Sequence, residues 1–155
     1  MKLDEADKHI LMRFQENARI TAKQLAEELS LTVTPVYERI RKLERAGYIR
    51  QYVALLDEQK IGLGLTAFCN VQLREHRRES LAEFQEQIMH LEEVVSCWHV
   101  AGVFDYLLLV KVPSMEAYQH LINNKLATFA NIGQVQSSFV MTHVKDEHRL
   151  PLGHL

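Results

Sequence analysis

The chain has 155 residues, of which 47% are hydrophobic, and a formal net charge of −2. This length can bury a real core and allows one domain or two small ones, but so small a net charge gives the whole molecule no strong field for nucleic acid. The two cysteines are too few for a disulfide framework. No stretch approaches the roughly 18 apolar residues that span a bilayer, and the first residues do not have the pattern of a signal peptide. We therefore expect a cytoplasmic protein with no membrane partner.

The charge is distributed unevenly along the chain. Residues 1–55 hold ten Lys and Arg against eight Asp and Glu, whereas residues 56–155 hold eight against twelve. Five basic and two acidic residues fall within residues 37–50. The basic charge is therefore concentrated where a groove-binding helix would need it, and the mildly acidic second half suits another task.

The first 50 residues show the pattern of three short helices. The first begins at an Asp4 cap and runs to about Asn17, and the second is capped by Thr21. Thr34-Pro35 supplies an N-cap and a first-turn proline for the third helix, and Gly47 ends it. Only a sharp corner fits between the second and third helices, so the pattern predicts a helix-turn-helix.

The third predicted helix hides Val36, Ile40 and Leu43 and offers a basic face, which suits the major groove of DNA. Scattered charge usually marks only a solvated helix face, but the preceding turn favours contacts with base edges and phosphates. Glu38 could instead pair with Lys42 four residues later. The candidate DNA-binding residues are Thr32, Thr34, Pro35, Tyr37, Glu38, Arg41, Lys42 and Arg45.

A change of composition after the third helix indicates a domain boundary. Tyr48–Leu55 has an extended pattern, and the polar run Asp57–Lys60 follows it. We predict an N-terminal domain over residues 1–52, a linker or extended strand over residues 53–62, and a second domain over residues 63–155.

The second half alternates strands with helices. The pattern predicts a strand at Leu65–Leu73, a helix at Arg77–Leu91, strands at Val94–Val100 and Asp105–Val112, a helix after Pro113-Ser114 and a strand at about Val135–Val144. The order βαββαβ is that of the ferredoxin-like fold. The chain is thus predicted to be α+β, with a winged-helix-like helix-turn-helix domain followed by a ferredoxin-like domain.

One face of the predicted sheet has no helices to cover it. Phe68, Leu107, Leu109 and Val140 fall on that face and are poorly suited to water. Dimerisation through the sheet is the simplest way to bury them.

Catalytic and metal-binding patterns are missing from the sequence. The eight histidines are scattered, and Cys97 and His99, although on one strand face, lack further ligands for zinc. No P-loop, dinucleotide fingerprint or nucleophile elbow occurs. We expect no enzyme activity, no cofactor and no metal, and we expect Cys69 and Cys97 to be reduced and mostly buried.

Two sets of residues, in this order along nearly the whole chain, resemble the Lrp/AsnC (feast/famine) family of transcription regulators, and the leucine-responsive branch more than the asparagine-responsive one. The N-terminal set is Leu3-Asp4, Asp7, Ile10-Leu11, Asn17-Ala18-Arg19, Leu25-Ala26, Arg39-Ile40, Leu43-Glu44 and Gly47-Tyr48-Ile49. The C-terminal set is Gly102-Val103-Phe104-Asp105-Tyr106-Leu107-Leu108, which is similar to the family's glycine–x–aromatic–aspartate turn.

This resemblance implies a homodimer, often assembling into octamers, that binds double-stranded DNA and responds to a free amino acid through its second (RAM) domain. Gly102 would let the ligand's carboxylate approach the backbone closely, and Asp105 would accept a hydrogen bond from its α-ammonium group. Phe104 would line the pocket for an apolar side chain such as that of leucine or methionine. Gly102 and Asp105 could also serve only as turn residues. The implied effector-binding residues are Ala101, Gly102, Phe104 and Asp105, with Ser137, Ser138 and Val140 as weaker candidates.

The leading hypothesis is therefore an amino-acid-responsive transcription regulator. An architectural DNA-binding protein, whose second domain only oligomerises, is the alternative and predicts DNA binding that no amino acid changes. An enzyme or its regulatory subunit ranks far behind, because the third helix would then have no purpose.

Overall fold

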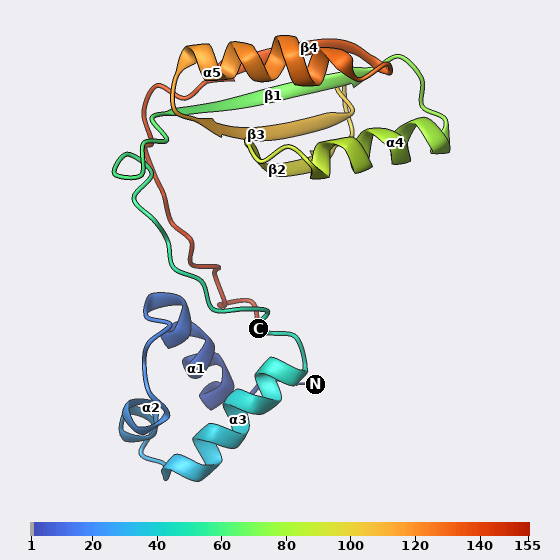
Figure 1. Cartoon of the computed structure of the whole chain (residues 1–155). Coiled ribbons are helices and arrows are strands. Elements are labelled where there is room, and N and C mark those ends of the chain that lie inside the picture. Colours follow the sequence, from blue (N-terminus) through green and yellow to red (C-terminus); the bar gives the residue numbers. More distant parts are fainter. Residues whose placement is uncertain (1) are drawn as a thin grey trace. The chain divides into compact units, whose positions relative to one another are not determined.

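The computed structural model describes residues 2–155, which form two compact units (Figure 1). The first unit contains the residues up to Leu55 together with Lys145–Leu155, and the second contains Leu56–Val144. The chain thus passes from the first unit to the second within the expected 53–62 linker, and it returns to the first unit for its last eleven residues, which the sequence had assigned to the second domain.

The first unit is built from helices α1 (Glu5–Glu16), α2 (Ala22–Leu29) and α3 (Val33–Arg45). The predicted caps of α1 and α2 are confirmed, because the Asp4 carboxylate accepts the Asp7 N–H at 2.9 Å and the Thr21 hydroxyl accepts the Gln24 N–H at 3.2 Å. Both helices carry the reciprocal bond of a capping box. Short polar signals in the sequence therefore determine where these two helices begin.

The start of α3 differs from the expectation. The helix begins at Val33 with Thr32 as its N-cap, so the prediction that Thr34 is the cap was wrong. Pro35 still lies in the first turn, where its missing N–H would have no helical partner, and therefore costs nothing there. The end of the helix is as predicted: Gly47 has φ of +77°, and its N–H donates to the Glu44 carbonyl at 3.0 Å.

A small apolar core joins the three helices. Ile10, Leu25, Val36 and Leu43 are fully buried in it. The segment after α3 remains on this unit because the Tyr52 hydroxyl donates to Glu44 at 2.9 Å and its ring meets the edge of Phe14. The structure describes no strand in this unit, so the only counterpart of the expected winged-helix character among the described residues is an extended segment after α3.

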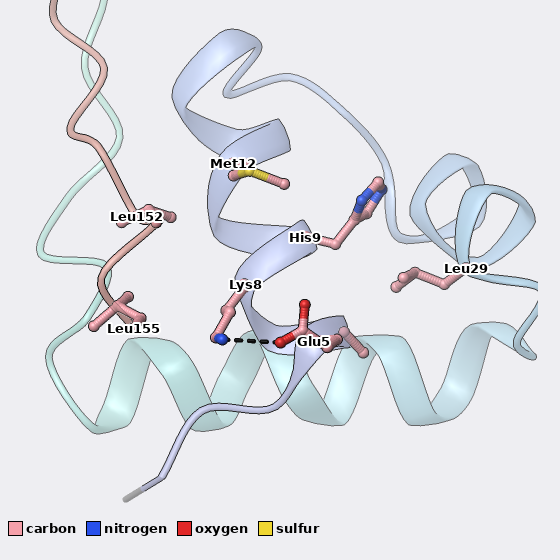
Figure 2. Close-up of a pocket in the computed structure, with 9 residues that line it drawn as sticks. Glu5, Lys8, His9, Met12, Leu29, Leu152 and Leu155 are labelled. Atoms are coloured by element: carbon pink, nitrogen blue, oxygen red, sulfur yellow. Dashed lines mark hydrogen bonds and ion pairs between the residues drawn. The ribbon is translucent and has the colours of Figure 1, made fainter.

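The C-terminal tail, Lys145–Leu155, packs against α1. The Gln15 side-chain amide donates to the Leu150 carbonyl at 3.3 Å and accepts the Leu150 N–H, while Leu152 packs against the apolar core. Figure 2 shows Leu152 and Leu155 on one side of α1, around a cavity of about 550 Å³. All nine residues that line this cavity belong to the first unit.

An ion-pair network connects α3 to the start of α1. Arg39 Nη1 lies 2.7 Å from Asp7 Oδ1 and 2.7 Å from Asp4 Oδ2, and the Asp7 side chain is only 5% exposed. Hydrogen bonds from the Asp7 N–H and from Arg39 hold the pKa of the Asp4 carboxyl below its usual range. The Arg39 side chain is therefore held by ion pairs within the unit, although the sequence counts it among the basic residues of the 37–50 segment.

The second unit is a four-stranded antiparallel sheet in the order β2-β3-β1-β4. Its strands are β1 (Leu65–Leu73), β2 (Val94–His99), β3 (Tyr106–Val112) and β4 (Ile132–Phe139). Helix α4 (Arg78–Met89) connects β1 to β2, and α5 (Met115–His120) leads into a π turn, η1 (Leu121–Lys125), and a 3-10 turn, η2 (Leu126–Thr128). The predicted βαββαβ order and the α+β class are confirmed.

Both helices cover the same face of the sheet. Phe84 and Ile88 of α4 and Tyr118 of α5 join one core with the inward residues of β1 and β3. The centroids of the Phe84 and Tyr106 rings lie 4.5 Å apart. The opposite face carries the side chains that alternate with these, including Phe68, Leu107 and Leu109.

The last strand was predicted too far along the chain. It covers Ile132–Phe139 rather than Val135–Val144. One further bond, from the Val140 N–H to the Thr66 carbonyl, closes the ladder where β1 itself begins, so β4 ends because its neighbour does. Its early start was missed because the Asn131–Gly133 segment resembles a turn.

The expectation that both cysteines are mostly buried was half right. Cys69 on the central strand β1 is fully buried, whereas Cys97 on the edge strand β2 is exposed. Both are free thiols in the described chain.

Replacing Arg39 by Met should destabilise the first unit by about 1–3 kcal/mol, because the buried Asp7 carboxylate loses its partner. The lowered pKa of Asp4 means that its bonds with the Asp7 N–H and with Arg39 stabilise the fold fully above about pH 4, and that this stabilisation disappears as the pH falls through the lowered value. Urea unfolding of wild type and variant by far-ultraviolet circular dichroism, at pH 7 and at pH 3, measures both effects.

Arg45→Met is the matched control, since Arg45 is an exposed arginine of the same helix, and it should change stability by no more than about 0.5 kcal/mol. The one tryptophan, Trp98, belongs to the second unit, so its fluorescence transition should stay in place in both variants. Equal midpoints for Arg39→Met and Arg45→Met would contradict a stabilising role for the network.

Candidate functional site

The eight residues predicted to contact DNA all lie on the exposed side of α3 and its preceding turn. Thr32, Thr34, Pro35, Tyr37, Glu38, Arg41, Lys42 and Arg45 are exposed. Val36, Ile40 and Leu43 point the other way, into the core. One helix thus separates a face that holds the unit together from a face that is open to a partner.

The exposed face of α3 is partly ordered by its own contacts. The Arg41 guanidinium carbon lies 4.8 Å from the centroid of the Tyr37 ring, which is a cation–π contact. The Arg45 Nε donates to the Arg41 carbonyl at 3.3 Å. Because Tyr37 and Arg41 are four residues apart, the stack lies along the helix axis and holds the guanidinium close to the helix surface.

Two side chains of α3 behave differently from the simplest sequence interpretation. Among the ion pairs of residues 2–155, none joins Glu38 to Lys42, so Glu38 stands open to an outside partner. Sequence reasoning also passed over Val33, an apolar residue that is 46% exposed. Its signal was its place next to Thr32 and Thr34 in the first turn of the helix.

The turn between β2 and β3 carries the first group of predicted effector residues. Ala101 and Gly102 are exposed, and Phe104 and Asp105 are half-buried. Gly102 has φ of +154°, which favours glycine, and a Cβ at this position would point into open space. A small ligand could therefore approach the backbone of the turn closely.

Asp105 already has partners for both carboxylate oxygens. Oδ2 accepts the Leu73 N–H at 2.7 Å, and Oδ1 lies 2.8 Å from His76 Nε2. The Asp105 backbone N–H also donates to the Val71 carbonyl at 2.9 Å. The side chain is 17% exposed, against 59% for His76, so a ligand could reach Oδ1 by displacing the histidine.

The second group of predicted effector residues lies elsewhere in the sheet. Ser137 pairs with Cys69 and Ser138 with Phe68, while Val140 bonds to Thr66 at the opposite end of β1 from the Leu73 that Asp105 binds. Strand β1 also separates β4 from β3. Within one chain, therefore, the structure does not bring the two groups together.

Ser137 faces the helices rather than open solvent. Its hydroxyl accepts a hydrogen bond from Tyr118, whose hydroxyl lies 2.9 Å from Cys69 Sγ. Burial raises the pKa of Tyr118 and of Cys69, so both stay protonated at neutral pH. Ser138 alternates with Ser137 along β4 and therefore belongs to the open face of the sheet, beside Phe68.

Metal and membrane sites have no counterpart in residues 2–155. Across this described range, no three His, Cys, Asp or Glu side chains converge as a metal site would require, and no helix has the length and apolar character to cross a bilayer.

Comparison with known proteins matches both halves of the chain to family models. Residues 3–50 match a winged helix-turn-helix DNA-binding model, and residues 66–150 match the Lrp/AsnC ligand binding domain. The transcriptional activator DecR of Escherichia coli K12 is 35% identical over 150 residues, covering 97% of this chain and 99% of that protein. The leucine-responsive regulatory protein of the same organism is 35% identical over 148 residues, covering 96% and 90%.

Solved structures agree with the sequence matches. The NMB0573 transcriptional regulator of Neisseria meningitidis, solved as an L-Met complex, superimposes with a TM-score of 0.94 at 37% identity over 99% of both chains. AsnC of E. coli has a TM-score of 0.88 at 21% identity, covers 94% of this chain and 97% of its own, and so shares the fold. The helix-turn-helix unit with its outward basic helix and the βαββαβ unit agree with these matches. The matches show that the chain belongs to the Lrp/AsnC family of DNA-binding transcription regulators, which are not enzymes.

Proposed function

We propose that this protein is a sequence-specific DNA-binding regulator whose activity or assembly responds to a free apolar amino acid, such as leucine or methionine. The observation that carries the DNA-binding part is the outward face of α3, where Arg41, Lys42 and Arg45 are exposed and uninvolved in the core. The proposed role implies a cytoplasmic location, where bacterial DNA lies; the relatives named above are bacterial.

The division of labour on α3 follows from the position of each residue. In a helix-turn-helix, the N-terminal part of the second helix approaches base edges, and flanking cations contact phosphates. We assign Thr32, Thr34, Pro35, Tyr37 and Glu38 to the groove, and Lys42 and Arg45 to phosphates. Arg41 lies between these groups and can reach either.

The amino-acid response is supported by the turn at Gly102 and by the family. One relative is named for its response to leucine, and one neighbour was solved with L-Met. In this chain the ligand's carboxylate would approach the backbone at Gly102, its α-ammonium group would take Oδ1 of Asp105 from His76, and Phe104 would line the side-chain pocket.

The second effector group supports a site between subunits. Since Ser138 and Val140 lie far along the sheet from Asp105 in one chain, they can complete a pocket around Asp105 only when they come from another copy. The proposed effector site therefore requires an oligomer, and a ligand bound there would change how subunits associate.

We propose that a second copy of the chain covers the open face of the sheet. Phe68 is 36% exposed and Trp98 is 45% exposed on this face, and they lie beside their strand partners Leu109 and Leu107. These four side chains form a continuous apolar stripe across β1, β3 and β2. An isologous pairing of two such stripes would bury both of them, and four such dimers could then build an octamer.

Arg41→Ala should weaken binding to a selected operator by about 1–3 kcal/mol if the arginine reads a base. Lys42→Ala should weaken binding to all sequences alike and reduce the salt slope of log K by about one. Fluorescence anisotropy with an operator selected from random duplexes, at several salt concentrations, measures both. Lys60→Ala, which removes the same charge from the second unit, should match wild type; an Arg41→Ala protein with wild-type affinity for every duplex contradicts the assignment.

A thermal-shift panel against all twenty amino acids should give a hit confined to apolar ones. A ligand at a hundredfold excess over its Kd stabilises the folded protein by about 2.7 kcal/mol. Asp105→Asn should abolish the shift, because the amide can still accept the Leu73 N–H but no longer offers a charge to the α-ammonium group. His76→Ala should instead strengthen the response by removing the competitor for Oδ1.

Either of two outcomes would contradict the sensor proposal. A wild-type shift in Asp105→Asn would remove Asp105 from the pocket. Silence across the whole panel, with operator binding intact, would favour the architectural DNA-binding protein, for which the occupied carboxylate of Asp105 serves only the fold.

Phe68→Asp should reduce the assembly to a lower mass, because a carboxylate at the centre of the apolar stripe would be buried without a partner. Light scattering after size exclusion should give wild type at a multiple of the 18.0 kDa chain and the variant at a smaller multiple or at 18.0 kDa. Met89→Asp is the control, since Met89 is 82% exposed on α4, away from the stripe. A monomeric wild type, or an unchanged mass for Phe68→Asp, would rule out this interface.

A further inference from the structure

The two ends of α3 offer different chemistry to DNA. The cations of its exposed face, Arg41, Lys42 and Arg45, are all in the C-terminal half. The N-terminal end, from Leu31 to Pro35, carries methyl groups and two threonine hydroxyls. It offers neither the guanidinium nor the amide groups that read guanine and adenine by paired hydrogen bonds.

The apolar side chains at this end are exposed. Leu31 is 42% exposed, Val33 is 46% exposed and Tyr37 is 47% exposed. The core of the unit is made by Val36, Ile40 and Leu43 from the other side of the helix, so the packing of the unit does not account for the valine at its first turn. A β-branched residue also brings no advantage to an exposed helix position.

Position along the helix connects this apolar end to the basic end. Val33, Tyr37 and Arg41 follow one another at intervals of four residues and so lie on one ridge of α3. The Arg41 guanidinium rests over the Tyr37 ring, at 4.8 Å from its centroid. A helix that lies in the groove along this ridge therefore presents methyl groups first, then an aromatic ring, then a cation.

In the major groove, thymine is distinguished by its C5 methyl group, which apolar side chains contact. We propose that the N-terminal end of α3 reads thymine through this methyl group, with Val33 as the central contact and Leu31 and Tyr37 beside it. The proposal rests on the proposed function, because it assumes that α3 enters the groove of an operator. It adds the chemical identity of one base that the operator must contain.

The helix geometry also gives the spacing of the contacts. Eight residues separate Val33 from Arg41, which corresponds to about 12 Å along the helix axis. That length spans at most about three to four base-pair steps, because a helix that follows the inclined groove rises along the DNA axis by less than its own length. The thymine that Val33 contacts should therefore lie within about four base pairs of the base or phosphate that Arg41 contacts.

Replacement of thymine by deoxyuridine tests the proposal, because it removes only the C5 methyl group and keeps base pairing. An operator is first selected from random duplexes with the full-length protein, and each thymine is then replaced in turn. We expect one or two positions per half-site at which wild-type affinity falls about fourfold, the change that corresponds to loss of one buried methyl group.

The Val33→Ala protein decides which residue makes the contact. It should bind the thymine and deoxyuridine duplexes with equal affinity at those positions, while its response to all other replacements follows wild type. Val144→Ala, a change at a 95% exposed valine of the second unit, should keep the full fourfold difference.

The outcomes separate this inference from the proposed function. Specific operator binding that no deoxyuridine replacement weakens would overturn the thymine contact and leave the regulator proposal standing. A fourfold loss that persists unchanged in Val33→Ala would overturn the role of Val33. Failure of any duplex to bind more tightly than random DNA would overturn the DNA-binding proposal and the thymine contact with it.

Discussion

The ion pairs between Arg39 and the two aspartates at the start of α1 tie α3, the helix with the exposed basic face, to the rest of its unit. Arg39 occupies a flank of α3, and its attachment to Asp4 and Asp7 at 2.7 Å adds to the core packing that fixes the rotation of that helix about its own axis. Because side chains on a helix are distributed by a fixed angle per residue, this rotation also directs Tyr37 and Arg41 outward. The nearly buried Asp7 would lose its charge compensation if α3 turned, so the unit resists that motion.

Asp105 combines a structural role with its candidate ligand role. Its backbone and Oδ2 fasten the β2–β3 turn to the end of β1, through Val71 and Leu73. Only Oδ1 faces a partner that can leave, the exposed His76. A ligand that displaces this histidine would keep the turn attached while it changes the charge presented at the surface. The turn-residue and ligand-binding interpretations of Asp105 are thus compatible, since they use different atoms of one side chain.

Local signals in the sequence were sufficient to predict most of the fold. The errors arose where the end of a strand, or the exposure of a side chain, depends on a neighbouring strand. Thr21 and Gly47 mark helix ends because a cap is satisfied within a few residues. The end of β4 depends on where β1 begins, and the exposure of Cys97 depends on β2 being an edge strand. The exposed face of α3 was predictable because it follows helical periodicity. The separation of Ser138 from Asp105 was not, since strand order decides it.

Helix α1 holds both α3 and the C-terminal tail. Its N-terminal end holds Arg39 of α3 through Asp4 and Asp7, and its last turn holds the tail through Gln15 and Leu150. The chain crosses between the units twice, after Leu55 and after Val144, and the tail follows the second crossing. A rod of 12 residues, about 18 Å long, thus lies between the contact with α3 and the contact with the tail. Because both contacts are made by one rigid helix, α3 and the tail belong to one packed unit although they lie far apart in the sequence.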